Sequence, residues 1–389
     1  MSSKRRIEWA MYALFVVAIM IAPLIMESFW LNRVAKYLVY GMLGVAVALS
    51  WGYAGILNLG QGLFFGAGAY MLAMSLKLAS QTSLQQGSDK PVPDFMLWNA
   101  EPGAPTELCC INKASFLWLP FQSQWFGVAM GMILPVAIGA VLGTIVFRKR
   151  ISGVFVSIIT LALVLLVRLV VIDAQPITNG FNGLTDLGWF NVLGLEFDPY
   201  IVPTYYLVAV SLSLVLVGAR LLVDTRAGII LQAVRDDQNR ARYLGFDVPA
   251  YQTFFFCVSA AIAGFAGMLY VIVSEFASPT FMDLTFSITM VVWAAVGGRS
   301  SILGACIGAI LINMISATVS ETEGFAEAWK AVIGLIFVLV VLYLPRGLGG
   351  LAHDLVDRIV TRTPNAAARA ARERPVVAIG GVGRWRRRH

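Results

Sequence analysis

Long apolar runs alternate with short polar links along most of the chain. A helix needs about 20 mostly apolar residues to cross ~30 Å of hydrocarbon. Runs of this length recur, and we predict ten spans at residues 9–27, 34–51, 59–79, 124–147, 152–172, 201–222, 251–274, 284–298, 301–319 and 329–344. Two closely spaced pairs of runs meet at 52–60 and 297–304, where the glycines predict broken or re-entrant helices. The pattern predicts an all-α, polytopic transmembrane helical bundle over residues 1–349, with Gly-interrupted helices.

The composition supports a membrane protein. Of the 389 residues, 58% are hydrophobic and only 13% are charged, whereas soluble domains carry about 25% charged residues. The first apolar run has no small-residue cleavage site before Glu27, so we expect it to remain as a span. The four cysteines show no metal-binding or redox spacing, and Cys257 and Cys306 lie inside predicted spans. We therefore expect no metal and no cofactor in this chain.

Lys and Arg gather in the links that the ten spans place on one side of the membrane. These basic segments are residues 4–6, 148–150, 224–249 and the tail after Arg346. The links at 174–200 and 275–283, on the other side, contain no Lys or Arg. Because basic links stay in the cytoplasm, we expect both termini and the 224–249 segment to be cytoplasmic. Arg33 and Lys36, near an outer link, are exceptions to this pattern.

The positive charge is concentrated at the C-terminal end. Of the net charge of +7, residues 350–389 supply +6, from nine Arg and three acidic residues. We expect this cytoplasmic tail to be disordered or to lie on membrane lipid, because anionic headgroups attract each basic residue by about 1 kcal/mol. The rest of the chain is nearly neutral, so a nucleic-acid partner is not expected.

Residues 224–249 form a polar and basic segment between two spans, and we expect one short helix there. Apolar residues recur at helical spacing: Ile230, Val234, Ala241 and Leu244. Charged residues occupy the other faces: Arg235, Asp236, Asp237, Arg240 and Arg242. Gly245 follows, where a helix end favours a residue that tolerates positive φ. Such a helix cannot enter lipid, so it either lies on the membrane or is held by another protein.

The run from Gly52 to Tyr70 carries amides in an apolar setting. Asn58 and Gln61 lie three residues apart among glycines, followed by Phe64 and Phe65. Amides in a membrane need partners, so these side chains should face the bundle interior. They either form interhelical hydrogen bonds that fix packing or line a path for a small polar solute.

Other polar residues also lie at membrane depth. The second Gly-interrupted run offers Trp293 and Asn313, and paired interrupted segments in two halves are typical of a transport site. Arg168 interrupts an apolar run near its outer end, where it is either a structural anchor or a gate, with Glu275 as a candidate partner.

Two links are longer than the connections of a compact bundle. Residues 80–123 contain five prolines interleaved with aromatic residues, which predicts an outer cap or docking surface. Residues 173–200 contain Asn179–Gly180 and Asn182–Gly183, which are tight-turn signals. The second link is therefore either a simple turn or a functional loop.

These segments carry a resemblance to a known family. QNRARYLG, from Gln238 to Gly245, resembles the cytoplasmic coupling loop of bacterial ABC importer permeases, with Ala241 and Gly245 in matching positions. GYAGILNLGQGLFFGAGAY, SAAIAGFAGMLY, AVGGRSSILGACIGA and LPRGLGG resemble membrane subunits of the branched-chain amino acid importer family, up to about residue 350. PDFMLWN, AVRDDQNRARYLGF and VVWAAVGGR look closer to its urea branch, although Asn58 and Gln61 stand where Ser and His are expected there.

The resemblance implies a permease driven by other subunits. The chain contains no GxxxxGK[ST] phosphate loop, so ATP is expected to be bound by separate ATP-binding cassette subunits. A second, related permease subunit would complete the pore, and an external solute-binding protein would deliver the solute. The residues implied in ATPase coupling are Arg235, Asp236, Asn239, Ala241, Arg242, Tyr243, Leu244 and Gly245.

The resemblance implies an importer permease in the bacterial inner membrane, and urea is the solute expected first. Residues expected along the translocation path are Asn58, Gln61, Phe64, Phe65, Arg168, Thr178, Asn179, Glu275 and Asn313. The alternative solutes are branched-chain amino acids, whose zwitterion Arg168 and Glu275 would hold. A carrier or channel that acts alone is a further alternative. An enzyme is not expected, because both histidines lie in the tail and no nucleophile–base pair is evident.

Overall fold

A computed structural model of the chain describes residues 3–80, 93, 95, 117–192, 194–321, 334, 338, 342 and 347–350. Most of the predicted 80–123 link and nearly all of the predicted span 329–344 lie outside these residues, as does the tail beyond residue 350. The described bundle extends to Glu321, and residues 347–350 form a short helical piece.

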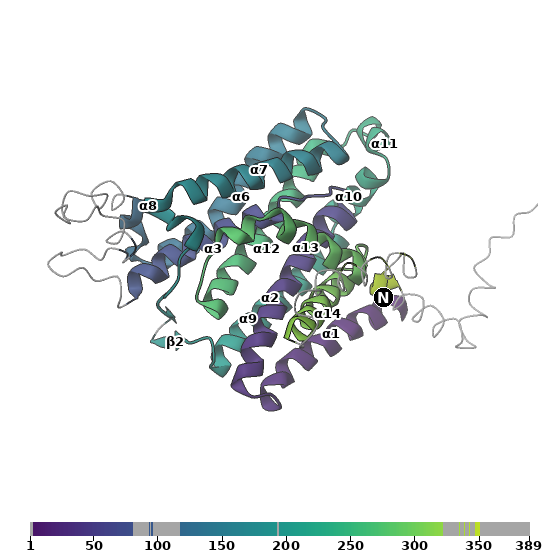
Figure 1. The fold of residues 1–389 in the computed structure, drawn as a ribbon. Coiled ribbons are helices and arrows are strands. Elements are labelled where there is room, and N and C mark those ends of the chain that lie inside the picture. Colours follow the sequence, from purple (N-terminus) through teal and green to yellow (C-terminus); the bar gives the residue numbers. More distant parts are fainter. Residues whose placement is uncertain are drawn as a thin grey trace, which may run out of the picture.

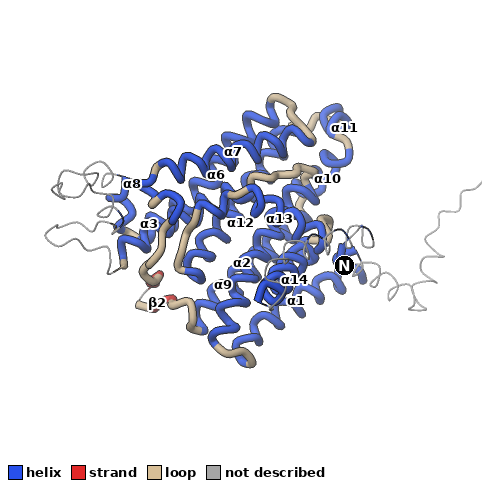
Figure 2. Tube along the Cα trace, in the orientation of Figure 1, coloured by secondary structure: helices blue, strands red, loops and turns tan. Residues whose placement is uncertain are grey.

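The described residues are almost entirely helical, with short loops between the helices (Figures 1 and 2). The long helices are α1 (Ser3–Ile21), α2 (Ser28–Val47), α3 (Gln61–Ala79), α6 (Gln124–Arg148), α7 (Val154–Asp173), α9 (Val202–Asp224), α12 (Val248–Ser274), α13 (Leu284–Gly297) and α14 (Ile302–Glu321). Eight of their segments are long and apolar enough to cross a membrane, and α13 is apolar but has only 14 residues. The predicted polytopic helical fold is confirmed.

Short elements connect these helices. They are η1 (Ala22–Leu24), the π-helical turn η2 (Ala48–Tyr53), η4 (Leu119–Gln122), α8 (Gln175–Thr178), η5 (Gly180–Asn182), β1 (Phe190–Val192), β2 (Leu195–Phe197), α10 (Arg226–Asp236), α11 (Gln238–Tyr243) and η6 (Pro279–Met282). β1 and β2 pair as an antiparallel hairpin, with Asn191 opposite Glu196.

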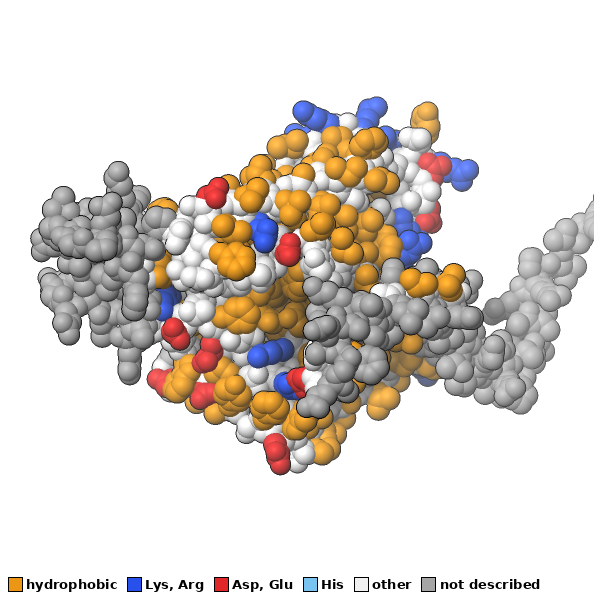
Figure 3. All heavy atoms as spheres, viewed as in Figure 1, with side chains coloured by type: hydrophobic (Ala, Val, Ile, Leu, Met, Phe, Trp, Pro, Cys, Tyr) orange, Lys and Arg blue, Asp and Glu red, His pale blue; other side chains and the backbone are white. Residues whose placement is uncertain are grey.

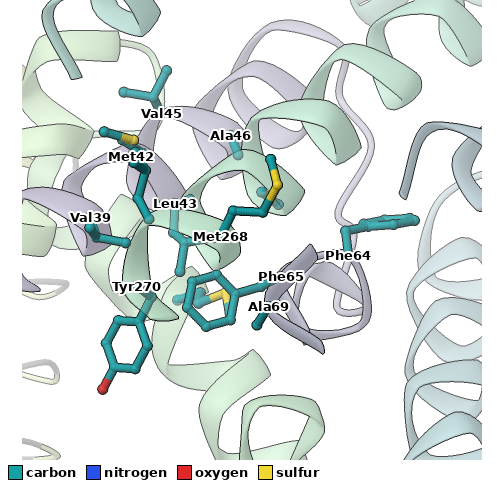
Figure 4. Close-up of a cluster of buried hydrophobic side chains, with 14 of the residues drawn as sticks. Val39, Met42, Leu43, Val45, Ala46, Phe64, Phe65, Ala69, Met268 and Tyr270 are labelled. Atoms are coloured by element: carbon teal, nitrogen blue, oxygen red, sulfur yellow. The ribbon is translucent and has the colours of Figure 1, made fainter. Parts of the chain in front are cut away.

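Helices α2, α3 and α12 form the centre of the bundle. The most apolar windows of α3 and α12 are 89% and 72% buried, whereas that of α1 is 11% buried. Figure 4 shows α2, α3 and α12 side chains packed together, among them Met42, Phe65 and Met268. At Gly68 an added Cβ would lie 2.1 Å from the Gly264 carbonyl oxygen, so α3 and α12 touch backbone to backbone.

Basic links gather at one end of the bundle, here called the basic end. Arg5 pairs with Asp224 at 3.0 Å, which places the start of α1 beside the end of α9. The basic end also carries α10 and α11, and the opposite end carries α8 and β2 (Figure 1). On the face shown in Figure 3, hydrophobic side chains cover the middle and Lys and Arg side chains gather near α11. The cytoplasmic orientation of the basic end remains a prediction from the positive-inside rule.

The opposite end is closed by backbone pairing between two links. Leu184 and Ala277 form an antiparallel bridge with N–H···O distances of 2.8 Å in both directions. Arg33, an exception to the basic pattern, forms an ion pair with Glu321 and lies over the Phe29 ring, 4.9 Å from its centroid. Its charge is thus neutralised within the bundle.

Candidate translocation path and coupling site

The connection between α2 and α3 leaves the helical conformation inside the bundle. The helix continues from α2 through η2 to Tyr53, and α3 begins only at Gln61. Gly55 has φ +71°, a conformation that residues with a side chain rarely adopt. Asn58 therefore lies on non-helical backbone, and Gln61 is the first residue of α3. We call residues 54–60 the α2–α3 break.

Hydroxyl groups of α7 satisfy the backbone of the α2–α3 break. Ser157 Oγ donates to the Leu57 carbonyl at 2.7 Å, and the Leu59 N–H donates to Thr160 Oγ1 at 3.2 Å. The Gly60 N–H donates to Asn58 Oδ1 at 2.8 Å. Non-helical backbone at membrane depth requires such partners, because lipid offers none.

In each of the two predicted amides, Asn58 and Gln61, one polar atom is hydrogen-bonded within the bundle and the other has no partner among the described residues. Gln61 Nε2 donates to Ser259 Oγ, which donates to the Ala46 carbonyl at 2.7 Å. Asn58 Nδ2 and Gln61 Oε1 are buried and have no hydrogen-bond partner among the described residues. A buried polar atom without a partner costs about 1–3 kcal/mol. Packing and solute binding are therefore both compatible with these amides.

A cluster of aromatic rings lies beside the start of α3. Its members are Tyr40, Phe65, Tyr270, Phe281, Phe286 and Trp293, with ring centroids 5.1 to 6.4 Å apart in the contacting pairs. Tyr40 Oη donates to Tyr270 Oη at 3.2 Å, whereas Trp293 Nε1 is buried with no partner in the part of the chain that the structure describes. Ser287 Oγ, which is also buried and has no partner within the described ranges, lies 3.0 Å from where a Cβ of Gly62 would stand. The cluster thus joins apolar walls to a few polar atoms.

Phe64 and Phe65 are both predicted to line the translocation path, but their side chains point in different directions and pack on different partners. Phe65 enters the aromatic cluster, whereas Phe64 packs on Phe256 with ring centroids 5.6 Å apart. Figure 4 shows the two side chains pointing apart. Adjacent residues on a helix lie on different faces, but Phe64 and Phe65 lie three and four residues after Gln61, so both border it on the helix surface.

The remaining predicted path residues have local roles. Thr178 Oγ1 bonds the Ala174 carbonyl at 3.0 Å, and Asn179 Nδ2 bonds the Gly183 carbonyl at 2.7 Å. Asn179 and Gly180 have φ of +61° and +56°, as expected for the tight turn that their sequence predicts. Asn313 Nδ2 bonds the Ala309 carbonyl of its own helix at 2.8 Å.

The expected pairing of Arg168 with Glu275 does not form. Glu275 accepts from Trp189 Nε1 at 2.9 Å, and no ion pair of Arg168 appears in the part of the chain that the structure describes. Arg168 Nε is buried and has no hydrogen-bond partner among the described residues, near the C-terminal end of α7. The sequence places both residues toward the outer side but does not specify their side-chain directions.

The 224–249 segment is not the single helix that its periodicity predicts. It forms α10 and α11, separated at Asp237, whose φ is −155° and whose carboxylate accepts from the N–H groups of Asn239 and Arg240. An aspartate satisfies the free donors of a helix start, so Asp237 begins a new helix. Ala241 packs with Val234 and Val248 in a small separate cluster.

Leu244 does not join that cluster, so the prediction of a common apolar face is wrong for this residue. Leu244 is 75% exposed and Tyr243 is 92% exposed at the end of α11. Gly245 has φ +86°, which confirms the predicted helix stop. Two large exposed side chains beside Asn239 and Arg242 form a compact surface that another protein can cover.

Arg235 bonds the bundle through one nitrogen, while its side chain stays 36% exposed; the predicted contact with a partner stays a prediction. Its Nη1 donates to the Gly52 carbonyl at 2.7 Å, and a Cβ on Gly55 would lie 2.8 Å from Arg235 Cγ. Its Nε and Nη2 donate to the exposed Asp236. Arg235 therefore ties α10 to the beginning of the α2–α3 break.

The turn between α13 and α14 also contacts the residues just before the α2–α3 break, at Gly52 and Tyr53. A Cβ on Gly52 would lie 1.7 Å from the Arg299 carbonyl oxygen, and Tyr53 Oη donates to the Ser300 carbonyl at 2.9 Å. The Arg299 guanidinium lies 5.2 Å from the Trp51 ring centroid. We call residues 51–55 with Arg235, Arg299 and Ser300 the basic-end junction.

The sequence did not single out four hydroxyl residues that complete the site: Ser157, Thr160, Ser259 and Ser287. Hydroxyl residues are common inside membrane helices, where they often bond their own backbone. Only the packing of α7, α12 and α13 against α3 distinguishes these four from the others.

Comparison with known proteins agrees with this architecture. A family profile described as "Branched-chain amino acid transport system / permease component" matches residues 29–341. The high-affinity branched-chain amino acid transport system permease protein LivM of Escherichia coli is 26% identical over 366 residues, covering 86% of this chain and 74% of LivM. No solved structure matches the chain significantly.

Other relatives cover less of the chain. The probable branched-chain amino acid permease LivH of Methanocaldococcus jannaschii is 26% identical over 260 residues, covering 61% of this chain and 79% of LivH. The ribose import permease RbsC of Escherichia coli is 26% identical over 225 residues, 55% of this chain and 67% of RbsC. Because the family profile spans most of the bundle, the chain belongs to the permease components of branched-chain amino acid-type ABC importers, multi-pass proteins of the bacterial inner membrane.

Proposed function

We propose that this permease imports branched-chain amino acids, with urea as the second candidate. This order reverses the one expected from the sequence. LivM and LivH are named for branched-chain amino acids, and urea has no support from the relatives described above. The main structural support is the position of Gln61, whose Oε1 is unpaired among the described residues, four residues before Phe65 of the aromatic cluster. An aliphatic side chain gains from burial against aromatic rings at about 25 cal/mol per Å², a gain that urea lacks.

The two unpaired amide atoms are complementary to an amino-acid zwitterion. Asn58 Oδ1 accepts from Gly60, which leaves Nδ2 as a donor for a carboxylate. Ser259 Oγ donates to a carbonyl and so accepts from Gln61 Nε2, which leaves Oε1 as an acceptor for an ammonium group. We propose these amides in the role that Arg168 and Glu275 were expected to have.

Competition uptake with the complete importer tests the solute. To decide between the two solutes, the uptake of radiolabelled leucine is measured with excess urea, and the uptake of radiolabelled urea with excess leucine. We expect leucine to enter and urea not to compete, because only leucine uses both the amides and the aromatic walls. Urea uptake that leucine leaves unchanged would contradict the proposal.

We further propose that α11 docks a separate ATPase subunit and that a second permease subunit and an external binding protein complete the importer. Tyr243 and Leu244 would enter the ATPase surface, with Asp236, Asn239 and Arg242 around them. The family of ABC importer permeases works with such partners. In this proposal Arg235 relays the movement of α10 to Gly52 and so to the α2–α3 break.

Gly245→Asp tests the docking. No atom of the described residues lies within 4 Å of an added Cβ at this position, so the substitution costs only about 1 kcal/mol from its positive φ. We expect uptake to be lost while the amount of folded permease is unchanged, because the new carboxylate lies next to the docking surface. Full uptake would argue against docking at α11. Solute accumulation by the permease alone would instead favour a stand-alone carrier.

A further inference from the structure

A cavity at the basic end lies apart from the junction and the α2–α3 break. It has a volume of about 530 Å³ and lies between the end of α6, the end of α11 and the start of α12. Three arginines line it: Arg148, Arg150 and Arg242. Thr144, Thr253 and the aromatic side chains of Phe246 and Phe254 also line it.

The arginines give this cavity an uncompensated positive charge. Among the described residues, none of the three forms an ion pair with an acidic side chain. Asp247 is the one acid in the lining, and its Oδ1 accepts the Ala250 N–H at 3.3 Å as the cap of α12. Three cations face one carboxylate, so the cavity attracts an anion.

Arg150 occupies a backbone position that favours glycine. It has φ +58°, its N–H donates to the Phe147 carbonyl at 3.0 Å, and the Ile151 N–H donates to the Val146 carbonyl at 3.1 Å. This pattern is the Schellman motif, whose left-handed residue is usually Gly. Keeping an arginine there has an energetic cost, and such strain is found at positions where the side chain has a function.

The walls next to the cavity are apolar and exposed. Phe254 of α12 is 50% exposed, and Ile145 and Val141 of α6 are 52% and 59% exposed. α6 and α12 pack together along their length, so these side chains continue from the cavity along the membrane-crossing surface. An acidic protein surface could neutralise the arginines but would leave these apolar side chains uncovered. A lipid covers both, with its headgroup in the cavity and its acyl chains on the apolar side chains.

We propose that this cavity binds the phosphate group of an anionic phospholipid, whose acyl chains lie along the exposed faces of α6 and α12. Basic pockets between membrane helices near the headgroup region bind anionic lipids through this combination of charge and apolar contact. The site does not depend on which solute the permease carries, nor on the coupling route through Arg235.

The test measures binding of phosphatidylglycerol to the purified full-length chain in detergent, with phosphatidylcholine and inorganic phosphate as separate probes. We expect the double variant Arg148→Gln/Arg150→Gln to bind phosphatidylglycerol about 30-fold more weakly, since each basic residue near a headgroup contributes roughly fivefold. Lys149→Gln is the matched control, because Lys149 lies between the two arginines but does not line the cavity. It should bind as the unaltered chain does.

Arg150→Gly separates lipid binding from folding. Glycine relieves the positive φ, so this variant should unfold at the same or a higher temperature while binding phosphatidylglycerol more weakly. Equal losses in Lys149→Gln and the double variant would overturn the proposal, because they would indicate diffuse attraction. Inorganic phosphate that competes at equal concentration would also overturn it in favour of a free anion. If the double variant lost ATPase docking but bound phosphatidylglycerol as before, the cavity would be a protein contact, and the proposal would be overturned.

Discussion

Two glycine-rich connections differ in how their backbone is held, one between α2 and α3 and the other between α13 and α14. The first depends on hydroxyls of α7, with Ser157 and Thr160 bonding Leu57 and Leu59. The second is bonded mainly within itself, since the Gly298 N–H donates to the Ala294 carbonyl at 3.0 Å and the Ser301 N–H donates to the Gly298 carbonyl at 2.9 Å. Its one remote bond described above comes from Tyr53 Oη to the Ser300 carbonyl. Local closure makes a tight helical hairpin, whereas remote partners make a segment that responds when other elements move.

The difference indicates where a transport cycle acts. The α13–α14 hairpin is packed through backbone, because a Cβ on Gly297 would lie 2.2 Å from the Gly304 carbonyl oxygen. The α2–α3 break carries the unpaired amides and touches α10 through Arg235. We therefore expect the hairpin to act as a fixed support and the break to transmit movement, and four substitutions test this contrast.

The largest effect is expected where the two connections touch. Gly52→Val places a side chain against the Arg299 carbonyl, 1.7 Å from the Cβ position, and backbone cannot yield as a flexible side chain does. We expect destabilisation of at least about 3 kcal/mol, measured as loss of monodisperse protein on heating. Gly218→Ala is the control, since nothing lies within 4 Å of its Cβ. Equal stability of both variants would disprove the close contact.

Arg235→Ala tests the link between α10 and the break. Loss of a hydrogen bond from a charged group costs about 1.5–3 kcal/mol, so we expect uptake to fall about 10- to 100-fold. ATPase docking should persist, because Tyr243 and Leu244 remain. The measurement is uptake together with co-purification of the ATPase.

Arg240→Ala serves as the control for Arg235. Its side chain is 87% exposed, and among the described residues its one ion pair is with Asp237, three positions before it, at 3.3 Å. A comparable fall in uptake in both variants would show that α10 and α11 act through surface charge, not through the basic-end junction.

Asn58→Leu tests the amides of the break against an amide of the hairpin. We expect the KM for leucine to rise about tenfold, because the donor for its carboxylate is removed. Asn313→Leu should leave KM unchanged, since Asn313 bonds only its own helix. Uptake kinetics of both variants provide the measurement, and an unchanged KM in Asn58→Leu would leave this amide a packing role only.

The smallest effect is expected from single hydroxyls. Thr160→Val removes the bond from the Leu59 N–H and a bond to the Ser157 carbonyl of its own helix, and Ser301→Ala removes the bond from the Gly304 N–H. Each substitution should cost about 1 kcal/mol. Only Thr160→Val should also slow uptake, because only its partner belongs to the break. If the two variants were equally stable and showed equal uptake, the α13–α14 hairpin would not differ from the α2–α3 break in its role in transport.

The sequence alone predicts those features that are local in the chain. Apolar runs predict the helices, because a membrane helix satisfies its backbone within its own segment. Asn179–Gly180 and Gly245 predict a turn and a helix stop, and their positive φ values agree. The split of 224–249 at Asp237 was also present in the sequence, as an acidic helix cap, but periodicity concealed it.

Tertiary structure decided which of several equivalent polar residues meet. Gln61 and Ser259 are 198 residues apart, and Arg235 and Gly52 are 183 apart. Hydrophobic pattern fixes how deep a side chain lies but not which distant group it faces, because one polar residue fits several buried neighbours. The sequence thus determined a many-span helical permease of this family, whereas packing of α3, α7, α10 and α12 decided that Arg235 bonds the Gly52 carbonyl and that Arg168 and Glu275 stay apart.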